Sequence, residues 1–215
     1  MQSLNRLNRL LTNSDRAEYK PTIDLMFKLC PEMMSRKIPE ANVQQAFVFD
    51  TVTDLIKDDY KVLSVGCFED TAFTAMVEYG YDVVGIDPET NVSLRDFTEA
   101  CTELYDIIFA TSVIEHVKDD EQFIRDICSL LKEGGVAILT TDFRDDYTPT
   151  MALPATDERF YTQKDLIERL PAQLEKYNCA LLGTPDWRGN PDFVYQGHNY
   201  SFATFVFQKH LATNV

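Results

Sequence analysis

The sequence predicts an α/β fold built on a mostly parallel, seven-stranded sheet, with a helical extension before it and an antiparallel hairpin at its C-terminal end. Two continuous apolar runs, residues 62–65 and 83–86, flank a helical segment, which is the pattern of parallel strands buried on both faces. The first run ends at Gly66 and the second at Asp87. Ligands bind at this carboxyl edge of such sheets, so the fold class also predicts where the site lies.

The composition excludes several classes of partner. The 215 residues include 35 acidic and only 20 basic side chains, giving a formal net charge of -15. Nucleic acids and anionic membrane surfaces both require clustered Lys and Arg, so neither is expected as a partner. A small-molecule substrate fits better.

The five cysteines are scattered, and neither a CxxC pair nor a zinc spacing is present. We therefore expect no metal site, and we expect the protein to lie in a reducing compartment. The N-terminus lacks the apolar core of a signal peptide, and no apolar stretch is long enough to span a bilayer. We therefore expect a cytoplasmic protein.

The first 58 residues are predicted to form a helical extension, and residues 59–215 the main domain. Leucines at helical spacing predict a first helix over 3–11. Pro21 opens a second helix that ends before Pro31, and a longer amphipathic helix covers 39–57. The long helix is expected to pack on the sheet. The first two helices could either pack on the sheet or form a lid over the active site, and the sequence does not decide between these alternatives.

The central elements follow in order. A helix over 71–79 stops at Gly80. A third strand is expected after Pro88, but the segment up to 104 shows only a weak helical pattern. A strand is predicted over 106–112, and a helix that begins at 119–121 ends at two glycines before a strand at 136–139.

The C-terminal part begins with a polar loop over 143–158, and a loop of this length after a strand is more often functional than not. Thr162 caps a helix to about residue 170, which Pro171 breaks or restarts. Strands at 179–182 and 201–208 have no helix between them, so they are expected to pair antiparallel.

The segment over 105–142, YDIIFATSVIEHVKDDEQFIRDICSLLKEGGVAILTTD, carries a family resemblance. It resembles the pattern YDxIxxxxVxEHVxD…LLKPGGxxxLT of the class I S-adenosylmethionine-dependent methyltransferases. Together with the order of elements, the resemblance covers about residues 39–209. It implies a Rossmann-like three-layer sandwich and S-adenosylmethionine as the cofactor.

The resemblance also assigns cofactor residues. The turn at Gly66 and Cys67 would wrap the methionine end of the cofactor, and Asp87 would bind both ribose hydroxyls. Thr111 and Ser112 would line the sulfonium side. The plainer alternative for Asp87 is a turn residue at the end of a strand.

The glycine motif of the family is altered in this chain. Ser64 stands where the family has an acid, and Phe68 and Asp70 replace the second and third glycines. A side chain at position 68 narrows the approach to the backbone unless it turns away. We hypothesise that Glu69 and Asp70 supply negative charge to the cofactor's ammonium group.

The acid that contacts adenine in the family is expected after the third strand. Asp96 is the candidate for that role.

Catalytic and substrate-binding residues are expected on the loops after the fourth and fifth strands. His116 is a candidate general base for a hydroxyl acceptor, or else only fixes its loop. Asp142 is the second catalytic candidate. Arg144 and Arg159 are candidates for substrate binding. The alternatives are a solvated or metal-binding acidic loop around Arg144, and an N-cap salt bridge for Arg159.

The predicted function is transfer of a methyl group from S-adenosylmethionine to a small polar acceptor, with a hydroxyl of a sugar or related metabolite as the leading choice. The first alternative is a non-catalytic scaffold that keeps the fold but has lost cofactor binding. A nucleotide-dependent oxidoreductase is a second. A homodimer is left open.

Overall fold

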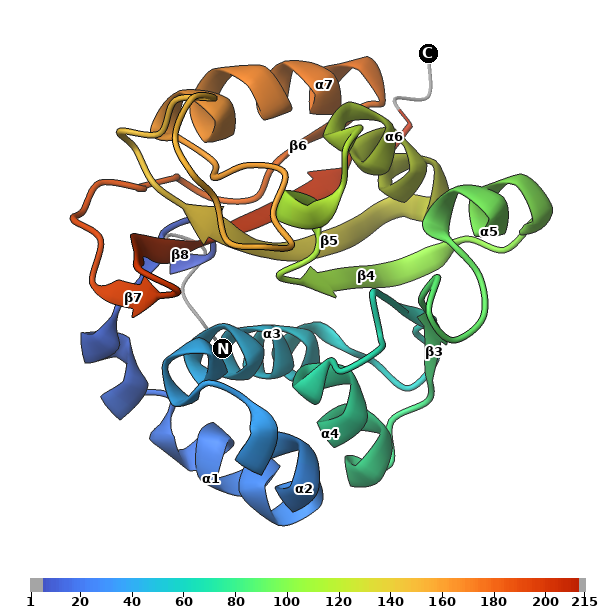
Figure 1. The fold of residues 1–215 in the computed structure, drawn as a ribbon. Helices are drawn as coiled ribbons and strands as arrows, with labels where there is room; N and C mark the ends of the chain where they lie inside the picture. The colour runs from blue at the N-terminus through green and yellow to red at the C-terminus, as the bar shows by residue number, and fades with distance from the viewer. Residues whose placement is uncertain (1–5, 213–215) are drawn as a thin grey trace.

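The computed structural model describes residues 6–212, which form an α/β sandwich around one eight-stranded sheet (Figure 1). The strand order is β1-β8-β5-β4-β2-β3, with β6 and β7 also paired to β8. The strands are β1 (Leu10–Leu11), β2 (Val62–Val65), β3 (Val83–Ile86), β4 (Tyr105–Thr111), β5 (Leu131–Phe143), β6 (Cys179–Leu181), β7 (Phe193–Tyr195) and β8 (His198–Lys209).

The central strands β2, β3, β4 and β5 run parallel, as predicted. Every residue of β2 is buried, because helices cover both faces of the sheet. The register places Val65 beside Ile86 and Thr111 beside Thr140, so the carboxyl ends of these strands meet at one edge. The expected hairpin is present, because β6 pairs antiparallel with β8 from Cys179 to Leu181.

The sheet has eight strands where seven were expected, and not all of them come from the expected segments. Within the described residues, the third strand expected after Pro88 is absent, and α5 (Leu94–Ala100) leads directly into β4. Strand β3 is therefore an edge strand, and Val84 is 42% exposed. Two short strands that were not expected, β1 and β7, bring the count to eight.

Helices cover the two faces of the sheet as separate layers, seen below and above it in Figure 1. Each layer has its own apolar core, so the sheet is shared between two hydrophobic clusters. One layer contains α1 (Lys20–Leu29), α2 (Pro31–Arg36), α3 (Asn42–Leu55) and α4 (Thr71–Tyr79), and the other contains α6 (Asp120–Leu130) and α7 (Leu170–Lys176). Short 3₁₀ segments are η2 (Asn13–Ala17), η3 (Pro39–Ala41) and η4 (Ile114–His116), and the π-helical turn η5 (Asp165–Arg169) precedes α7. Within residues 6–212, no helix has the length and apolar character needed to cross a membrane.

The second and third predicted helices are confirmed as α1 and α3, with Pro21 in the first turn of α1. Pro31 both ends α1 and opens α2, since proline is tolerated in a first turn. Pro171 is likewise in the first turn of α7 and continues the helix that η5 begins.

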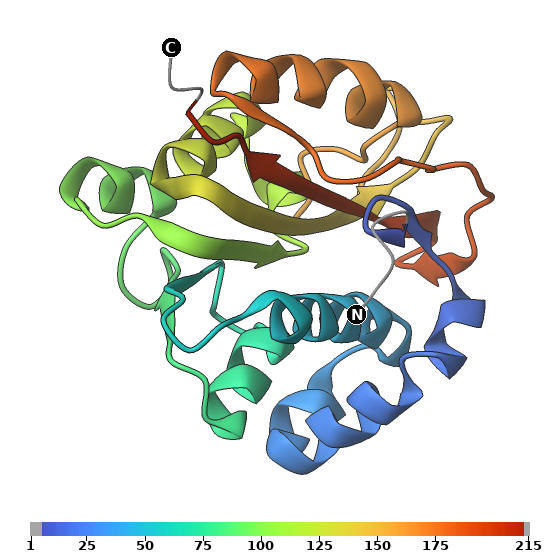
Figure 2. The same ribbon diagram turned by 180° about the vertical axis from the view of Figure 1, so that it is seen from behind.

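The helix predicted over 3–11 is wrong for its described part. Residues 3–5 lie outside the described residues, and Leu10–Leu11 form β1, which pairs antiparallel with β8 (Figure 2). The side chain of Asn8 is fully buried, donates to the carbonyl oxygens of Leu182 and Val206, and accepts from the Val206 amide. Leucine spacing cannot reveal a buried asparagine that completes the hydrogen bonds of a sheet, so the tertiary contact decided the conformation.

Candidate active site

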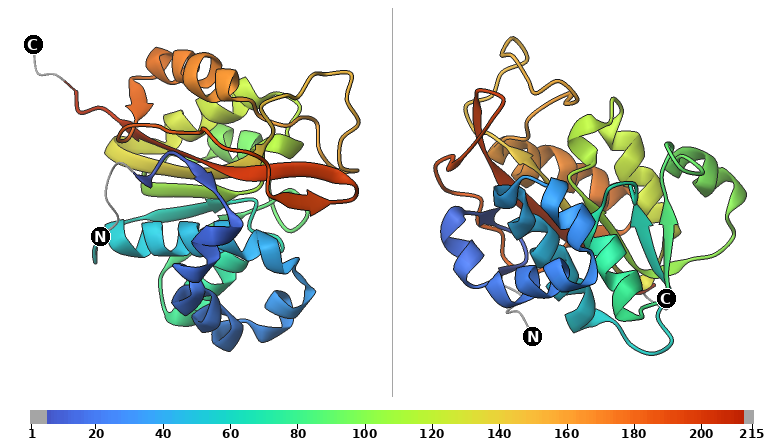
Figure 3. Two further views of the ribbon diagram at one scale, coloured as in Figure 1. Left: turned by 90° about the vertical axis from the view of Figure 1, so that its left-hand side faces the viewer. Right: turned by 60° about the horizontal axis from the view of Figure 1, so that its bottom comes forward.

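A cavity of about 990 Å³ lies at the carboxyl edge of the central strands. Residues that follow β2, β3, β4 and β5 line it, as expected for a doubly wound sheet. The loop over 144–160 and the β7–β8 hairpin project from the same end of the sheet (Figure 3, left). Both contribute to the lining, through residues such as Pro154 and Tyr195.

Gly66 forms the tight turn that follows β2. Its φ of +80° is a left-handed conformation, and its amide donates to the Ile86 carbonyl oxygen over 2.8 Å. A Cβ at this position would lie 2.5 Å from Cγ2 of Val113, so the turn packs directly against the segment after β4. Only glycine satisfies both conditions.

The altered glycine motif stays compatible with an open site. Phe68 is 52% exposed at the cavity, and its amide donates to Oδ2 of Asp87 over 3.1 Å. Asp70 is the N-cap of α4, where it accepts from the Phe73 amide. Burial raises the pKa of Asp70 to about 6. Glu69 is held by Arg36 at 2.9 Å, so its charge is already partly balanced.

Asp87 lies at the end of β3 and lines the cavity. Its Oδ2 accepts from Phe68 and its Oδ1 from the Glu89 amide over 2.8 Å, while its own amide donates to Oδ1 of Asn91. Each carboxylate oxygen keeps a lone pair for a further donor. The chemistry fits a ribose diol, which offers two hydroxyl donors.

Thr111 and Ser112 line the middle of the cavity. Ser112 has a φ of +55°, and its amide donates to Oγ1 of Thr140 over 3.1 Å. The buried Gln44 on α3 fixes this arrangement, since it donates to Oγ of Ser112 and accepts from Oγ1 of Thr140. Sequence reasoning missed Gln44, because an amide on a mostly apolar helix carries no signal of its own.

The end of the cavity next to β5 combines three carboxyl groups with one imidazole. Glu115, Asp142 and Asp157 all line it, together with His116. Nδ1 of His116 lies 3.1 Å from Oδ1 of Asp157 and 3.2 Å from the carbonyl oxygen of Thr156. The predicted pair His116 and Asp142 is therefore brought to one place, beside Glu115 of the EHV segment and beside Asp157, which the sequence did not single out.

These groups shift one another's protonation. Burial raises the pKa of Asp142 well above its usual range, and the nearby charges of Glu115 and Asp157 add to that effect. Burial likewise raises the pKa of Glu115. For His116, burial lowers the pKa, but the contact with Asp157 and the charge of Glu115 outweigh burial and raise it to about 9. The residues 6–212 contain no set of three or more His, Cys, Asp or Glu side chains arranged to hold a metal ion.

Two of the residues predicted to bind the cofactor lie beside the cavity instead of lining it. Sγ of Cys67 packs so close to Gly85 that a Cβ there would lie 2.9 Å away. Asp96 lies in the first turn of α5, where its carboxylate accepts from Oγ of the N-cap residue Ser93 over 2.6 Å. The neighbouring residues Ser93 and Arg95 line the cavity in its place.

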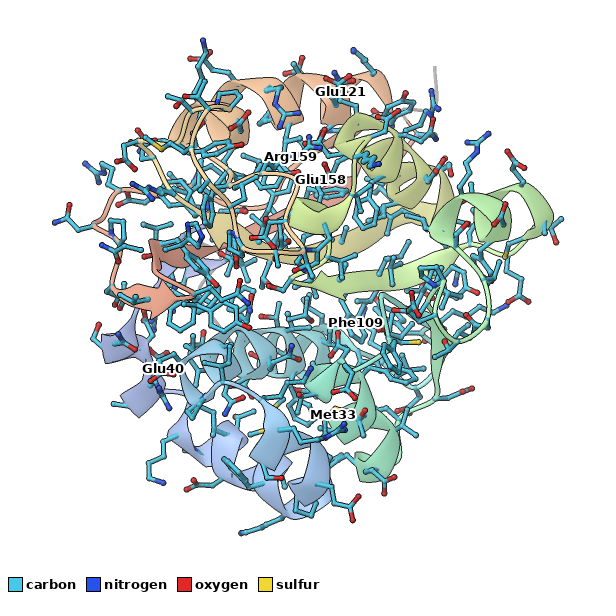
Figure 4. All side chains as sticks on the ribbon, viewed as in Figure 1. Met33, Glu40, Phe109, Glu121, Glu158 and Arg159 are labelled. Carbon is cyan, nitrogen blue, oxygen red and sulfur yellow. The ribbon has the colours of Figure 1, made fainter. Side chains whose placement is uncertain are left out.

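Arg159, predicted to bind substrate, points into the protein. Its Nη2 donates to the carbonyl oxygens of Val117 and Lys118, and its Nη1 lies 3.0 Å from Oδ2 of Asp120. Figure 4 shows Arg159 and Glu158 on the α6 side of the sheet, opposite Met33 and Glu40. Arg159 therefore anchors the turn that carries Glu115 and His116.

Arg144, the second arginine predicted to bind substrate, lies outside the main cavity. It borders a separate depression with Gly189 and Asn199 and pairs with the exposed Asp146 at 2.7 Å. The roles predicted for the site residues stay predictions.

Three ubiquinone biosynthesis O-methyltransferases share parts of the sequence. The human mitochondrial ubiquinone biosynthesis O-methyltransferase is 31% identical over 104 residues, which cover 38% of this chain and 28% of that protein. A counterpart from Rickettsia canadensis is 26% identical over 46% of this chain and 50% of its own length. The chain thus spans half or less of these two relatives. A counterpart from Leptothrix cholodnii is 25% identical over 78% of this chain and 77% of its own length.

Solved structures show the same fold at low sequence identity. The cyclase SpnF is 14% identical, with a TM-score of 0.57 over 89% of this chain and 96% of its own. A S-adenosylmethionine-dependent methyltransferase from Methanosarcina mazei is 14% identical, with a TM-score of 0.51 over 75% of this chain and 97% of its own. Because one of these proteins is a cyclase, the fold alone does not fix the reaction.

A match over most of the chain shows which family it belongs to. A family model described as a methyltransferase domain matches residues 33–181, which include the Gly66 turn, Asp87 and the segment from Tyr105 to Asp142. The resemblance inferred from the sequence is thereby confirmed. The chain belongs to the methyltransferase-domain family, and its fold is the one seen in a solved S-adenosylmethionine-dependent methyltransferase.

Proposed function

We propose that this chain transfers a methyl group from S-adenosylmethionine to a hydroxyl of a small acceptor. The observation that carries the proposal is one continuous cavity that joins Gly66 and Asp87 at one end to Glu115, His116 and Asp142 at the other. Family membership supports the cofactor, and the similarity to O-methyltransferases supports oxygen as the atom methylated.

The residues present fit the cofactor. Asp87 would accept from the ribose hydroxyls, the Gly66 turn would face the methionine end, and Thr111 and Ser112 would lie along the sulfonium. The acidic lining suits a ligand that carries positive charge at its sulfonium and ammonium groups. When bound, the cofactor supplies an already activated methyl group.

The chain's own part in the reaction is to orient the acceptor and take up its proton. Orientation is the larger contribution, because the cofactor needs no further activation. Two groups at the acceptor end are candidate bases. Neutral His116 has a free Nε2 when its Nδ1 donates to Asp157, and ionised Asp142 is a stronger base than an ordinary aspartate because its pKa is raised.

The wall of the cavity beside Asp142 is aromatic. Phe193, Tyr195, Tyr200 and Phe202, from the β7–β8 hairpin and the start of β8, line the cavity. A flat acceptor ring fits this surface, and the sugar hydroxyl expected from the sequence remains one candidate.

Three further expectations are kept as proposals, namely a cytoplasmic location, a homodimer, and a boundary near residue 58 between the helical extension and the main domain. The extension takes part in the site, because Gln44 on α3 lines the cavity and holds Ser112.

Calorimetric titration with S-adenosylmethionine and S-adenosylhomocysteine tests the cofactor site. Asp87→Asn keeps the shape of the side chain and removes the charge, so its affinity should fall about tenfold or more. Asp82→Asn, the same change on an exposed residue before β3, is the control. Absence of binding by a folded protein would favour the non-catalytic alternative, and binding of a nicotinamide dinucleotide instead would favour the oxidoreductase.

Release of S-adenosylhomocysteine with a panel of hydroxyl compounds then tests the acceptor. Turnover of amines or thiols but of no hydroxyl compound would contradict oxygen as the methylated atom.

A further inference from the structure

The acceptor end of the cavity holds three buried carboxyl groups beside one imidazole, and this crowding raises the pKa of Glu115 and Asp142 as long as no further cation is bound. Glu115 is fully buried, Asp142 is 5% exposed, and the side chain of Asp157 is 2% exposed. Three carboxyl groups so far from water are expensive unless they are paired or protonated. The one cation among them is His116, which pairs with Asp157.

The other cations that line the cavity are engaged elsewhere. Lys37 lies 3.5 Å from Oε2 of Glu69, and Arg95 pairs with Asp126 at 3.1 Å and with Glu99 at 2.6 Å. Arg159 points away from the cavity to two carbonyl oxygens and Asp120. The described part of the chain therefore leaves Glu115 and Asp142 without a basic partner of their own.

At this end of the cavity, two buried carboxylate oxygens also have no hydrogen-bond donor among residues 6–212. Oε2 of Glu115 accepts from Oγ1 of Thr141 over 3.2 Å, but its Oε1 has no partner. Oδ1 of Asp157 contacts His116, but its Oδ2 has no partner. Buried acceptors are nearly always satisfied in native proteins, so two of them at one end of a cavity indicate a ligand that donates hydrogen bonds there.

The cofactor does not supply that donor if it binds as proposed. Asp87 follows β3, whereas Asp142 is on β5, and β2 and β4 lie between them. Neighbouring strands are about 4.8 Å apart, so the two ends of the site are separated by about 14 Å. A cofactor held by its ribose at Asp87 reaches its sulfonium near β2 and β4, and the acids lie beyond it, where the acceptor binds.

The aromatic wall completes a site for an organic cation. Tyr200 lies beside Asp142 and Tyr195 lines the same cavity. Aromatic faces attract ammonium groups, and buried carboxylates accept their N–H donors.

We propose that the acceptor of this enzyme is a small compound that carries a positively charged amine, which Glu115, Asp142 and Asp157 bind. This inference rests on the proposed function, because it names the substrate class of the same site. It predicts that acceptors bearing a carboxylate are excluded, since they would place a like charge among three buried acids.

Three probes that share a catechol ring and differ in the charge of one short side chain test the inference. These are dopamine, 4-propylcatechol and 3,4-dihydroxyphenylacetate, whose side chains carry an amine, no charge and a carboxylate. Their affinities are measured by calorimetry, with the protein free and saturated with S-adenosylhomocysteine. The amine should bind about tenfold or more tighter than the neutral probe, and the acid should bind most weakly.

Variants show whether the named acids cause the preference. Glu115→Gln and Asp157→Asn keep the shape of each side chain, and each should reduce the preference for the amine several-fold. Asp186→Asn is the matched control, because Asp186 is exposed and pairs with Arg188 on the surface. Circular dichroism and the affinity for S-adenosylhomocysteine identify a variant that has lost its fold.

The outcomes separate the inference from the proposed function. Equal affinities for the three probes, no binding of any probe, or a preference that survives both variants would overturn the inference. If the protein binds the cofactor and methylates the neutral probe without favouring the amine, the proposed function stands and the inference fails. If the cofactor does not bind, the proposed function fails, while the preference for the amine in the free protein still decides whether this end of the cavity binds cations.

Discussion

The contact between His116 and Asp157 makes the protonation of the predicted base measurable. Asp157→Asn removes the charge that raises the pKa of His116 to about 9 and keeps the shape of its partner. At a pKa of about 9, only about one imidazole in a hundred is neutral at pH 7. Loss of an opposite charge at this distance should lower the pKa by about one to two units, so the neutral fraction at pH 7 should rise tenfold or more.

The sequence contains three histidines, so NMR titration of their ring signals reports His116 directly. If His116 is the base, kcat/KM of the native protein should rise about tenfold per pH unit up to about pH 9, and the inflection of the Asp157→Asn variant should lie lower. His116 titrating near its ordinary value in the native protein would refute the reasoning. A rate that is flat between pH 7 and 9 would exclude His116 as the base and leave Asp142.

The same contact contributes to stability with a defined sign. Because the pKa of His116 is raised on folding, its contribution is complete below about pH 6.5 and is lost as the pH rises through about 9. The difference would amount to about 3 kcal/mol for a buried group, but the side chain is 39% exposed, so about 1 kcal/mol remains after screening. Urea unfolding at pH 6 and pH 9.5 should show this loss in the native protein and less of it in Asp157→Asn.

Three other substitutions have defined outcomes in urea unfolding. Gly66→Ala should lower the free energy of unfolding by about 2–4 kcal/mol, because the new Cβ would lie 2.5 Å from Cγ2 of Val113 at a φ of +80°. Adding Val113→Ala should restore part of that loss. A Gly66→Ala protein of native stability would contradict the geometry. Asp70→Asn should raise the free energy of unfolding by about 1–3 kcal/mol at pH 7 and leave it unchanged at pH 3.5. The reason is that the buried carboxylate destabilises the folded protein increasingly as the pH rises from 3.8 to about 6. A gain at both pH values would argue against that cause. Arg159→Met should lower the free energy of unfolding by about 2–4 kcal/mol, because Arg159 is held by buried partners. It should also raise KM for the acceptor more than Kd for S-adenosylhomocysteine. The exposed control Arg188→Met should change neither the stability nor these two constants.

Local patterns were sufficient for the elements that set the edge of the site. The apolar runs before Gly66 and Asp87 identify β2 and β3, because parallel strands buried on both faces are apolar throughout. The EHV segment placed Glu115 and His116 after β4, where the structure has them. These features depend only on neighbouring residues, so one sequence contains them.

What the sequence could not predict depends on contacts between distant segments. Gln44 reaches Ser112 and Thr140 from α3, and Asp157 meets His116 only because the loop after β5 folds back over the turn. The charge of Arg159 is visible in the sequence, while the distant carbonyl oxygens to which it donates are not.

The pairing of β1 with β8 joins the two ends of the chain. Leu10 lies opposite Ala203, so β1 cannot take its place until the segment around residue 203 has been synthesised. During translation, the early helices and the parallel strands can assemble first, while the segment around residue 10 waits for β8. A ribosome stalled before residue 198 would therefore release a chain with both its first strand and its last strand missing from the sheet, and with an open edge at β5 that invites aggregation.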